Sequence, residues 1–253
     1  MEKQGVEGII KQNMGVEHED TRRSIINVFN AVPEDLENFV AGDVKVALVP
    51  GRSRLIAPTQ EQDELFYFLE GEAYFKIFRR QNPAEAKYRL DEGDRIVFPK
   101  GFAYIGGATE DSIIVACSKH MNSTAGKALG LTYRNLEPEM NRNQAFFPLF
   151  DKISGFYARQ VKIAKVHVDA ELGNHFHNYC EIFFMIRGEA KATVQHILGT
   201  GKRKYDLVPG DELLIPKGYA HKIEAKAGTV LLGCTSSPYI SSEQNDHKPE
   251  FEL

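Results

Sequence analysis

Cysteine is scarce in this sequence of 253 residues. Only Cys117, Cys180 and Cys234 are present. So small and odd a number excludes the disulfide framework that holds many small secreted domains together. The N-terminus shows no charged-then-apolar secretory pattern. Because reduced thiols are the rule in the cytoplasm, we expect a cytoplasmic protein.

Long apolar runs and an excess of basic charge are also missing. No apolar stretch approaches the about 18 residues of a membrane-spanning helix, so we expect no membrane partner. The 31 basic and 35 acidic residues are interspersed and give a net charge of -4. The absence of a basic stripe excludes electrostatic binding of nucleic acid. The length allows one large domain or two small ones.

An internal repeat organises the chain. The segment ELFYFLEGEA that begins at Glu64 returns as EIFFMIRGEA, beginning at Glu181, an offset of 117 residues. The same offset relates Gly93 to Gly210, Pro99 to Pro216, and Cys117 to Cys234. The register holds over about 50 residues without a gap, which indicates a duplicated unit.

Each copy has the pattern of short β-strands. Segments rich in β-branched and aromatic residues are separated by glycine and proline. They lie at residues 65–69, 74–78, 95–98 and 112–118, and again at 182–186, 191–197, 212–215 and 229–235. Long amphipathic helical patterns are scarce. The sequence therefore predicts an all-β protein built of barrels or sandwiches, and a barrel leaves no exposed sheet edge.

The parts outside the repeat are less informative. Residues 122–152 contain two prolines and polar clusters, and we interpret them as the linker between the copies. We expect domains at residues 1–135 and 136–253. Residues 1–30 and 236–253 could cover a barrel mouth or pack on the other domain, and the sequence leaves this open.

Metal-ligand residues gather in the second copy. His175, His177 and Glu181 have equal parity, and alternate side chains of a strand share one face, so all three could point into one barrel. His221 follows the turn at residues 216–218, near the start of another strand. A lone histidine is usually structural, but this set offers three nitrogens and one oxygen. Such a set suits one divalent ion of Mn, Fe, Zn, Ni or Co and does not select among them.

The second copy resembles the cupin superfamily. That family has the motif HxH, three or four residues, Glu, six residues and Gly, which His175, His177, Glu181 and Gly188 match. Its second motif, Gly, five residues, Pro-x-Gly, two residues and His, ends here at His221. The resemblance implies two tandem cupin barrels of the double-stranded β-helix, or jelly-roll, type. Two positions depart from the pattern.

The first departure is the family glycine six residues before the first histidine. Asp169 occupies that position and Gly173 lies nearer, which suggests a rearranged loop beside the site. The second is the asparagine often found after the last histidine, where Ala225 stands.

The first copy keeps the frame of the repeat and loses the ligands. At the offset of 117 residues, Pro58, Gln60 and Tyr104 replace the three histidines, and only Glu64 remains. One carboxylate and a phenol do not hold a divalent transition ion. We therefore predict one metal ion per chain, in the second barrel only.

Other candidates for chemistry lie on the segment before the HxH motif. One face of residues 157–168 carries Lys165 and His167, which we name as a candidate acid, base or anion clamp. A solvated strand face explains them equally well. The opposite face, with Lys162, is more apolar toward its end and suits packing.

Three functions remain open on the sequence. The family mostly uses its ion for catalysis, which implies a metal-dependent isomerase, epimerase, hydrolase or lyase acting on a small polar metabolite, such as a sugar or a keto or hydroxy acid. A metal-dependent dioxygenase is the second possibility, and a non-enzymatic small-molecule-binding protein is the third. We expect a homodimer.

Overall fold

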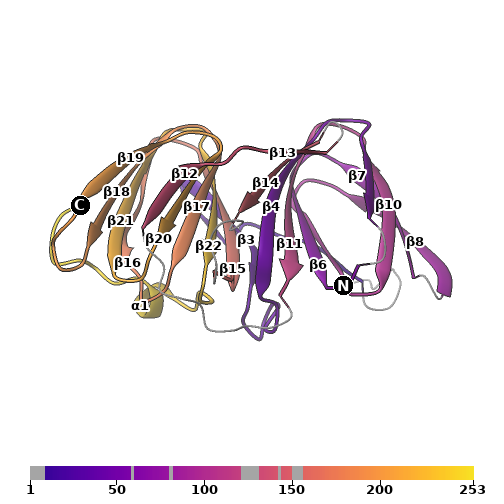
Figure 1. The fold of residues 1–253 in the computed structure, drawn as a ribbon, viewed down its shortest axis with the longest axis horizontal. Coiled ribbons are helices and arrows are strands. Elements are labelled where there is room, and N and C mark those ends of the chain that lie inside the picture. Colours follow the sequence, from indigo (N-terminus) through magenta and orange to yellow (C-terminus); the bar gives the residue numbers. More distant parts are fainter. Residues whose placement is uncertain (1–8, 58–59, 80–81, 121–130, 142–143, 150–155) are drawn as a thin grey trace. The chain divides into compact units, whose positions relative to one another are not determined.

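The computed structural model describes residues 9–57, 60–79, 82–120, 131–141, 144–149 and 156–253 (Figure 1). The chain forms two compact units, each made of β-sheets. Unit 1 comprises residues 1–15, 41–123 and 138–151, and unit 2 comprises residues 16–40, 124–137 and 152–253. In the described part of the chain, no helix is both long and apolar enough to cross a membrane.

Unit 1 contains two antiparallel sheets. The larger has the strand order β1-β9-β6-β11-β4-β14-β13 and the smaller β5-β10-β7-β8. Aromatic side chains from both sheets dominate the core between them. The strands are β1 (Ile10–Asn13), β4 (Ala41–Val49), β5 (Arg54–Ala57), β6 (Glu64–Glu70), β7 (Ala73–Arg79), β8 (Asn82–Leu90), β9 (Asp94–Phe98), β10 (Phe102–Ala108), β11 (Ser112–Lys119), β13 (Glu139–Asn141) and β14 (Gln144–Leu149).

Unit 2 repeats this architecture. Its sheets have the orders β12-β20-β17-β22-β15-β3-β2 and β16-β21-β18-β19. Its core is mostly aliphatic. The elements are β2 (His18–Glu19), β3 (Arg23–Asn30), β12 (Thr132–Asn135), β15 (Gln160–Val166), β16 (Ala170–Phe176), β17 (Glu181–Arg187), β18 (Ala190–His196), β19 (Arg203–Leu207), β20 (Asp211–Ile215), β21 (Tyr219–Ala225), β22 (Val230–Thr235) and the short helix α1 (Ser242–Asn245).

The offset of 117 residues relates the two units strand by strand. It carries β6, β7, β9 and β10 onto β17, β18, β20 and β21 with the same bounds. The order β9-β6-β11-β4 likewise corresponds to β20-β17-β22-β15. The predicted all-β fold of two tandem jelly-roll barrels is confirmed, and the strands expected from the sequence are present.

The two units exchange strands along the chain. Strand β3 precedes all of the main strands of unit 1, yet it pairs with β15 of unit 2. Strand β14 follows β12 of unit 2, yet it pairs with β4 of unit 1. Each unit therefore draws strands from both sides of the expected boundary between residues 135 and 136.

The expected linker is more structured than its composition suggests. In its described part, residues 122–152 carry β12, β13 and β14. Pro148 is accommodated in β14 because β13 pairs only with residues 144–146, so the missing N–H of Pro148 costs no bond on that side. The interpretation of this stretch as a plain linker is wrong.

Candidate metal centre

The predicted ligands converge where the chain passes from one sheet of unit 2 to the other. His175 lies near the end of β16, His177 lies in the connection that follows, and Glu181 begins β17. The three residues therefore do not lie on one strand, and the prediction that equal parity alone aligns them is wrong. The turn between β16 and β17 brings these side chains together, and His221 on β21 pairs in register with His175.

A bulge shapes β16 beside the site. The register with β21 shifts between Gly173 and His175, and Gly173 and Asn174 both have positive φ, of 84° and 70°. A Cβ on Gly173 would lie 3.0 Å from Cδ2 of His221. The position of Gly173, closer to His175 than the family glycine, suggested a rearranged loop here, and the structure has this bulge. Such bulges often redirect a side chain next to a functional site.

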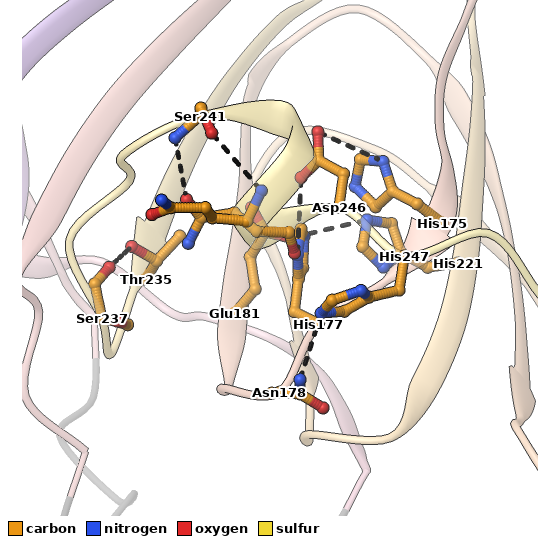
Figure 2. Close-up of polar contacts among 12 residues, drawn as sticks. His175, His177, Asn178, Glu181, His221, Thr235, Ser237, Ser241, Asp246 and His247 are labelled. Atoms are coloured by element: carbon orange, nitrogen blue, oxygen red, sulfur yellow. Dashed lines mark hydrogen bonds and ion pairs between the residues drawn. The ribbon is translucent and has the colours of Figure 1, made fainter.

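The three histidines and Glu181 form a compact cluster (Figure 2). One ring nitrogen of each of His175, His177 and His221 lies within 4.8 Å of the others. Oε2 of Glu181 lies 3.3 Å from Nε2 of His177 and 3.5 Å from Nε2 of His221. The side chains of His177, Glu181 and His221 are almost completely buried.

The cluster fits a metal ion. Among the described residues, Nε2 of His177 and Oε2 of Glu181 are buried and lack a hydrogen-bond partner, whereas Oε1 of Glu181 is paired with the ammonium group of Lys162. A buried polar atom without a hydrogen bond destabilises the fold unless a bound ion or another group interacts with it. Neutral imidazole and carboxylate are common ligands of divalent transition ions.

Burial and neighbouring charge set the protonation of the cluster. Burial, together with the other two histidines, lowers the pKa of His175 to about 2. Burial also lowers the pKa of His221 to about 4. Burial opposes ionisation of Glu181, but Lys162 and two histidines outweigh it and hold its pKa well below the usual range. The pKa of His177 is raised, because Glu181 outweighs the effect of burial on this ring.

Lys162 is a site residue that the sequence reasoning missed. Its Nζ lies 3.0 Å from Oε1 of Glu181. It sits on the face of β15 that was expected to serve only packing, opposite Gly233 of β22. A Cβ on Gly233 would come within 3.0 Å of Cε of Lys162, so the glycine leaves room for the lysine side chain to cross the strand.

The repeat holds the signal that could have identified Lys162. At the offset of 117 residues, Lys45 and Glu64 correspond to Lys162 and Glu181. In unit 1, Lys45 also acts electrostatically on Glu64. A lysine and a glutamate thus recur at equivalent positions in both copies, and this recurrence could have marked Lys162 as a neighbour of Glu181.

The structure does not bring Lys165 and His167 into the cluster. Lys165 has the opposite parity to Lys162 and lies on the other face of β15. His167 is exposed just beyond the end of that strand, and its Nε2 lies 2.6 Å from Oγ of Ser24. Their role as an acid, a base or an anion clamp stays a prediction.

In unit 1, the position of His221 belongs to an aromatic cluster. Tyr104 is buried, and its ring centroid lies 5.0–5.5 Å from those of Phe66, Phe75 and Phe98. Pro58, which stands at the position of His175, lies outside the described residues. At this end of the unit 1 core, the described side chains thus pack against one another, whereas the equivalent position in unit 2 carries a candidate metal ligand.

The C-terminal residues lie against the cluster of unit 2. The ring Nδ1 of His177 donates to the backbone oxygen of Asn245 at 2.7 Å. The carboxylate of Asp246 lies 3.6 Å from Nδ1 of His177 and 3.9 Å from Nδ1 of His175. These residues lie outside the repeat, so no internal comparison pointed to them.

Comparison with known proteins supports a relation to the cupins. Residues 26–147 match the cupin family model. No curated protein sequence matches the chain.

Solved structures share the fold at low sequence identity. The oxalate decarboxylase of Lactobacillus farciminis, in a formate complex, is 12% identical, with a TM-score of 0.50 over 94% of this chain and 89% of that one. A mutant of the oxalate decarboxylase of Bacillus subtilis is 14% identical, with a TM-score of 0.51 over 94% and 80%. The coconut allergen cocosin is 13% identical, with a TM-score of 0.51 over 92% and 86%. Both barrels therefore have the cupin fold.

Proposed function

We propose that this protein with two cupin barrels is an enzyme that uses one divalent transition metal ion, held in unit 2 by His175, His177, Glu181 and His221. The observation that carries the proposal is the convergence of three imidazole rings on the buried carboxylate of Glu181, where Nε2 of His177 and Oε2 of Glu181 lack hydrogen-bond partners among the described residues. The fold alone does not decide between functions, since a decarboxylase and a seed allergen resemble the chain about equally.

We propose a small anionic metabolite, such as a keto or hydroxy acid, as the substrate. The charges of a divalent ion and of Lys162 exceed those of Glu181 and Asp246, so the loaded site has a net positive charge. When bound, such an ion polarises a carbonyl or hydroxyl oxygen. A sugar is the less favoured substrate, because it offers no negative charge to this site.

The residues of the chain orient the site. Lys162 holds one oxygen of Glu181, so the carboxylate is fixed before any ligand arrives. Burial keeps His175 and His221 neutral, which leaves their ring nitrogens able to bind a cation. Isomerase, epimerase, hydrolase and lyase reactions all suit this arrangement, and the dioxygenase alternative differs in requiring O₂.

Elemental analysis of the purified protein tests the metal proposal. We expect one equivalent of metal per chain, and His221→Ala should weaken binding by more than about 100-fold, because loss of a ligand exceeds the 10–100-fold cost of an outer-shell change. Glu64→Gln is the matched control in unit 1 and should leave metal content unchanged. Two equivalents per chain, or none with any of the five ions, would contradict the proposal.

Substrate screening then separates the reaction classes. Keto and hydroxy acids are offered to the metal-loaded protein with and without air. Turnover that persists without O₂ supports the isomerase, hydrolase or lyase class, whereas turnover that requires O₂ supports a dioxygenase. Binding of these acids without turnover would support the non-enzymatic alternative.

A further inference from the structure

The residues that follow the last strand of unit 2 return to the metal-ligand cluster. Helix α1 is capped by the side chain of Ser241, which accepts from the backbone N–H of Gln244. Beyond the helix, His247 forms an isolated antiparallel bridge with Phe176 of β16, with backbone hydrogen bonds of 2.8 Å and 3.0 Å. We call Ser241–His247 the C-terminal segment.

Asn245 fixes the geometry of this segment. Its side chain is buried, and its Oδ1 accepts from the backbone N–H groups of Ile240 and Ser241, at 2.8 Å and 3.1 Å. Its backbone oxygen faces the other way and accepts from Nδ1 of His177 at 2.7 Å. One residue thus both closes the turn and contacts a predicted ligand.

This contact determines which nitrogen of His177 is available. A carbonyl oxygen can only accept, so Nδ1 of His177 carries the proton. In the neutral ring, the lone pair is then on Nε2, which lies 3.3 Å from Oε2 of Glu181. Two hydrogen-bond acceptors that face each other in a buried site are unfavourable by themselves, and a cation bound by both would stabilise them.

Asp246 adds a carboxylate on the same side of the cluster. Figure 2 shows it facing His175 and His177 from the C-terminal segment, and its oxygens lie 3.9 Å and 3.6 Å from their Nδ1 atoms. Metal-binding histidines commonly donate their second N–H to a carboxylate or a backbone carbonyl, which fixes the tautomer and strengthens the ligand.

We propose that the C-terminal segment is the outer shell of the metal centre, in which the backbone oxygen of Asn245 and the carboxylate of Asp246 are positioning groups for His177 and His175. This inference rests on the proposed metal binding by unit 2. It assigns a role to residues that neither the repeat nor the family motifs include.

Binding of Co²⁺ alone tests the role of the segment. Asn245→Ala removes the side chain that anchors the turn, and Asp246→Asn removes the negative charge. Each should weaken Co²⁺ binding about 10–100-fold, measured by competition with a chromophoric chelator, and should alter the visible Co²⁺ absorption bands. Gln244→Ala is the matched control, because its side chain is exposed on the same helix.

A second readout needs no metal. Nitrogen NMR of the histidine rings should show His177 protonated at Nδ1 in the wild-type protein and a mixture of tautomers in Asn245→Ala. Thermal unfolding identifies any variant that has lost its fold. If that occurs for Asn245→Ala, Asp246→Asn carries the affinity test.

The outcomes separate this inference from the proposed function. Wild-type Co²⁺ affinity and unchanged bands in both variants would overturn the outer-shell role while metal binding itself stands. Failure of the wild-type protein to bind any of the five ions would overturn the proposed function. The tautomer of His177 would then still decide whether the segment positions that ring.

Discussion

At the scale of single residues, the two copies of one lysine–glutamate pair behave in opposite ways. In unit 2, Lys162 contacts Glu181 and helps to hold its pKa far below the usual range. In unit 1, Nζ of Lys45 lies 3.0 Å from Asp43, and burial raises the pKa of Glu64 to about 7. The offset places Gln160 at the position of Asp43, so unit 2 has no competing carboxylate there.

The raised pKa of Glu64 makes stability depend on pH. Folding favours the neutral carboxyl, so its contribution is complete below the ordinary pKa of 4.5 and is lost as the pH rises through about 7. We expect the stability of the wild-type protein relative to Glu64→Gln to fall by about 1–2 kcal/mol across this window, after allowance for partial solvent exposure. Urea unfolding of both proteins at both ends of the window measures this difference, in which the opposite contributions of His175 and His221 cancel.

Asp43→Gln is the sharper variant for the same prediction. It removes a charge that raises the pKa of Glu64 and frees Lys45 to approach the carboxylate. The pKa of Glu64, followed by carboxyl-carbon NMR, should therefore fall toward its ordinary value. An unchanged titration would show that Asp43 does not hold Lys45 away.

Residue chemistry in unit 2 was predictable only in part. The HxH motif and the second motif identified all four members of the cluster, because family motifs preserve such spacing. Lys162 was missed because an apolar strand face was assumed to exclude a charged residue, although the glycine opposite leaves space for it. Asn245 and Asp246 could not be predicted from the sequence, because both lie outside the repeat. The contact of Asn245 is also made by its backbone carbonyl, which any residue could supply.

At the scale of elements, the bulge in β16 is the most specific feature beside the site. Gly173 meets two requirements at once: a positive φ of 84°, and an approach to His221 so close that a Cβ would lie 3.0 Å from the ring and push it aside. Gly228 has a similar φ of 82° but nothing within 4 Å of its would-be Cβ. Substitutions at the two glycines therefore distinguish the effect of backbone strain, which both share, from that of steric contact, which only Gly173 would have.

Substitution of these glycines tests the bulge. Both Gly173→Ala and Gly228→Ala should lose about 1–2 kcal/mol of stability, because an L-residue resists the left-handed conformation. Only Gly173→Ala should also displace His221, and we expect its Co²⁺ affinity to fall about 10-fold, since a site tolerates displacements of only about 0.5 Å. Equal Co²⁺ affinity in the two variants would show that the close approach of Gly173 to His221 is unimportant.

Strands were the elements that the sequence predicted best. Short β-branched and aromatic runs between glycines gave β6, β7, β17 and β18 nearly residue for residue, because packing between two sheets demands that pattern. The strands within residues 122–152 were missed, since their prolines and polar residues resemble a loop. Pairing with a distant strand, rather than local propensity, makes them strands.

At the scale of the whole molecule, duplication was visible in the sequence and strand exchange was not. A repeat can be found by aligning the sequence with itself. The pairing of β3 with β15, or of β14 with β4, joins residues far apart in the sequence and leaves no such signal. Consecutive strands usually neighbour one another, and that rule suggested a simple division of the chain. The exchange instead makes each unit depend on residues from both halves.

Separate production of residues 1–135 and 136–253 tests this dependence. The second fragment lacks β3, which buries Val28 and Phe29, and β15 would become an exposed sheet edge prone to aggregation. The first fragment lacks β13 and β14. We expect neither fragment alone to unfold cooperatively in circular dichroism, whereas the two produced together should assemble and bind one Co²⁺ per pair. Cooperative unfolding and wild-type Co²⁺ affinity of residues 136–253 alone would instead establish them as an independent domain, for which the exchanged strand is dispensable.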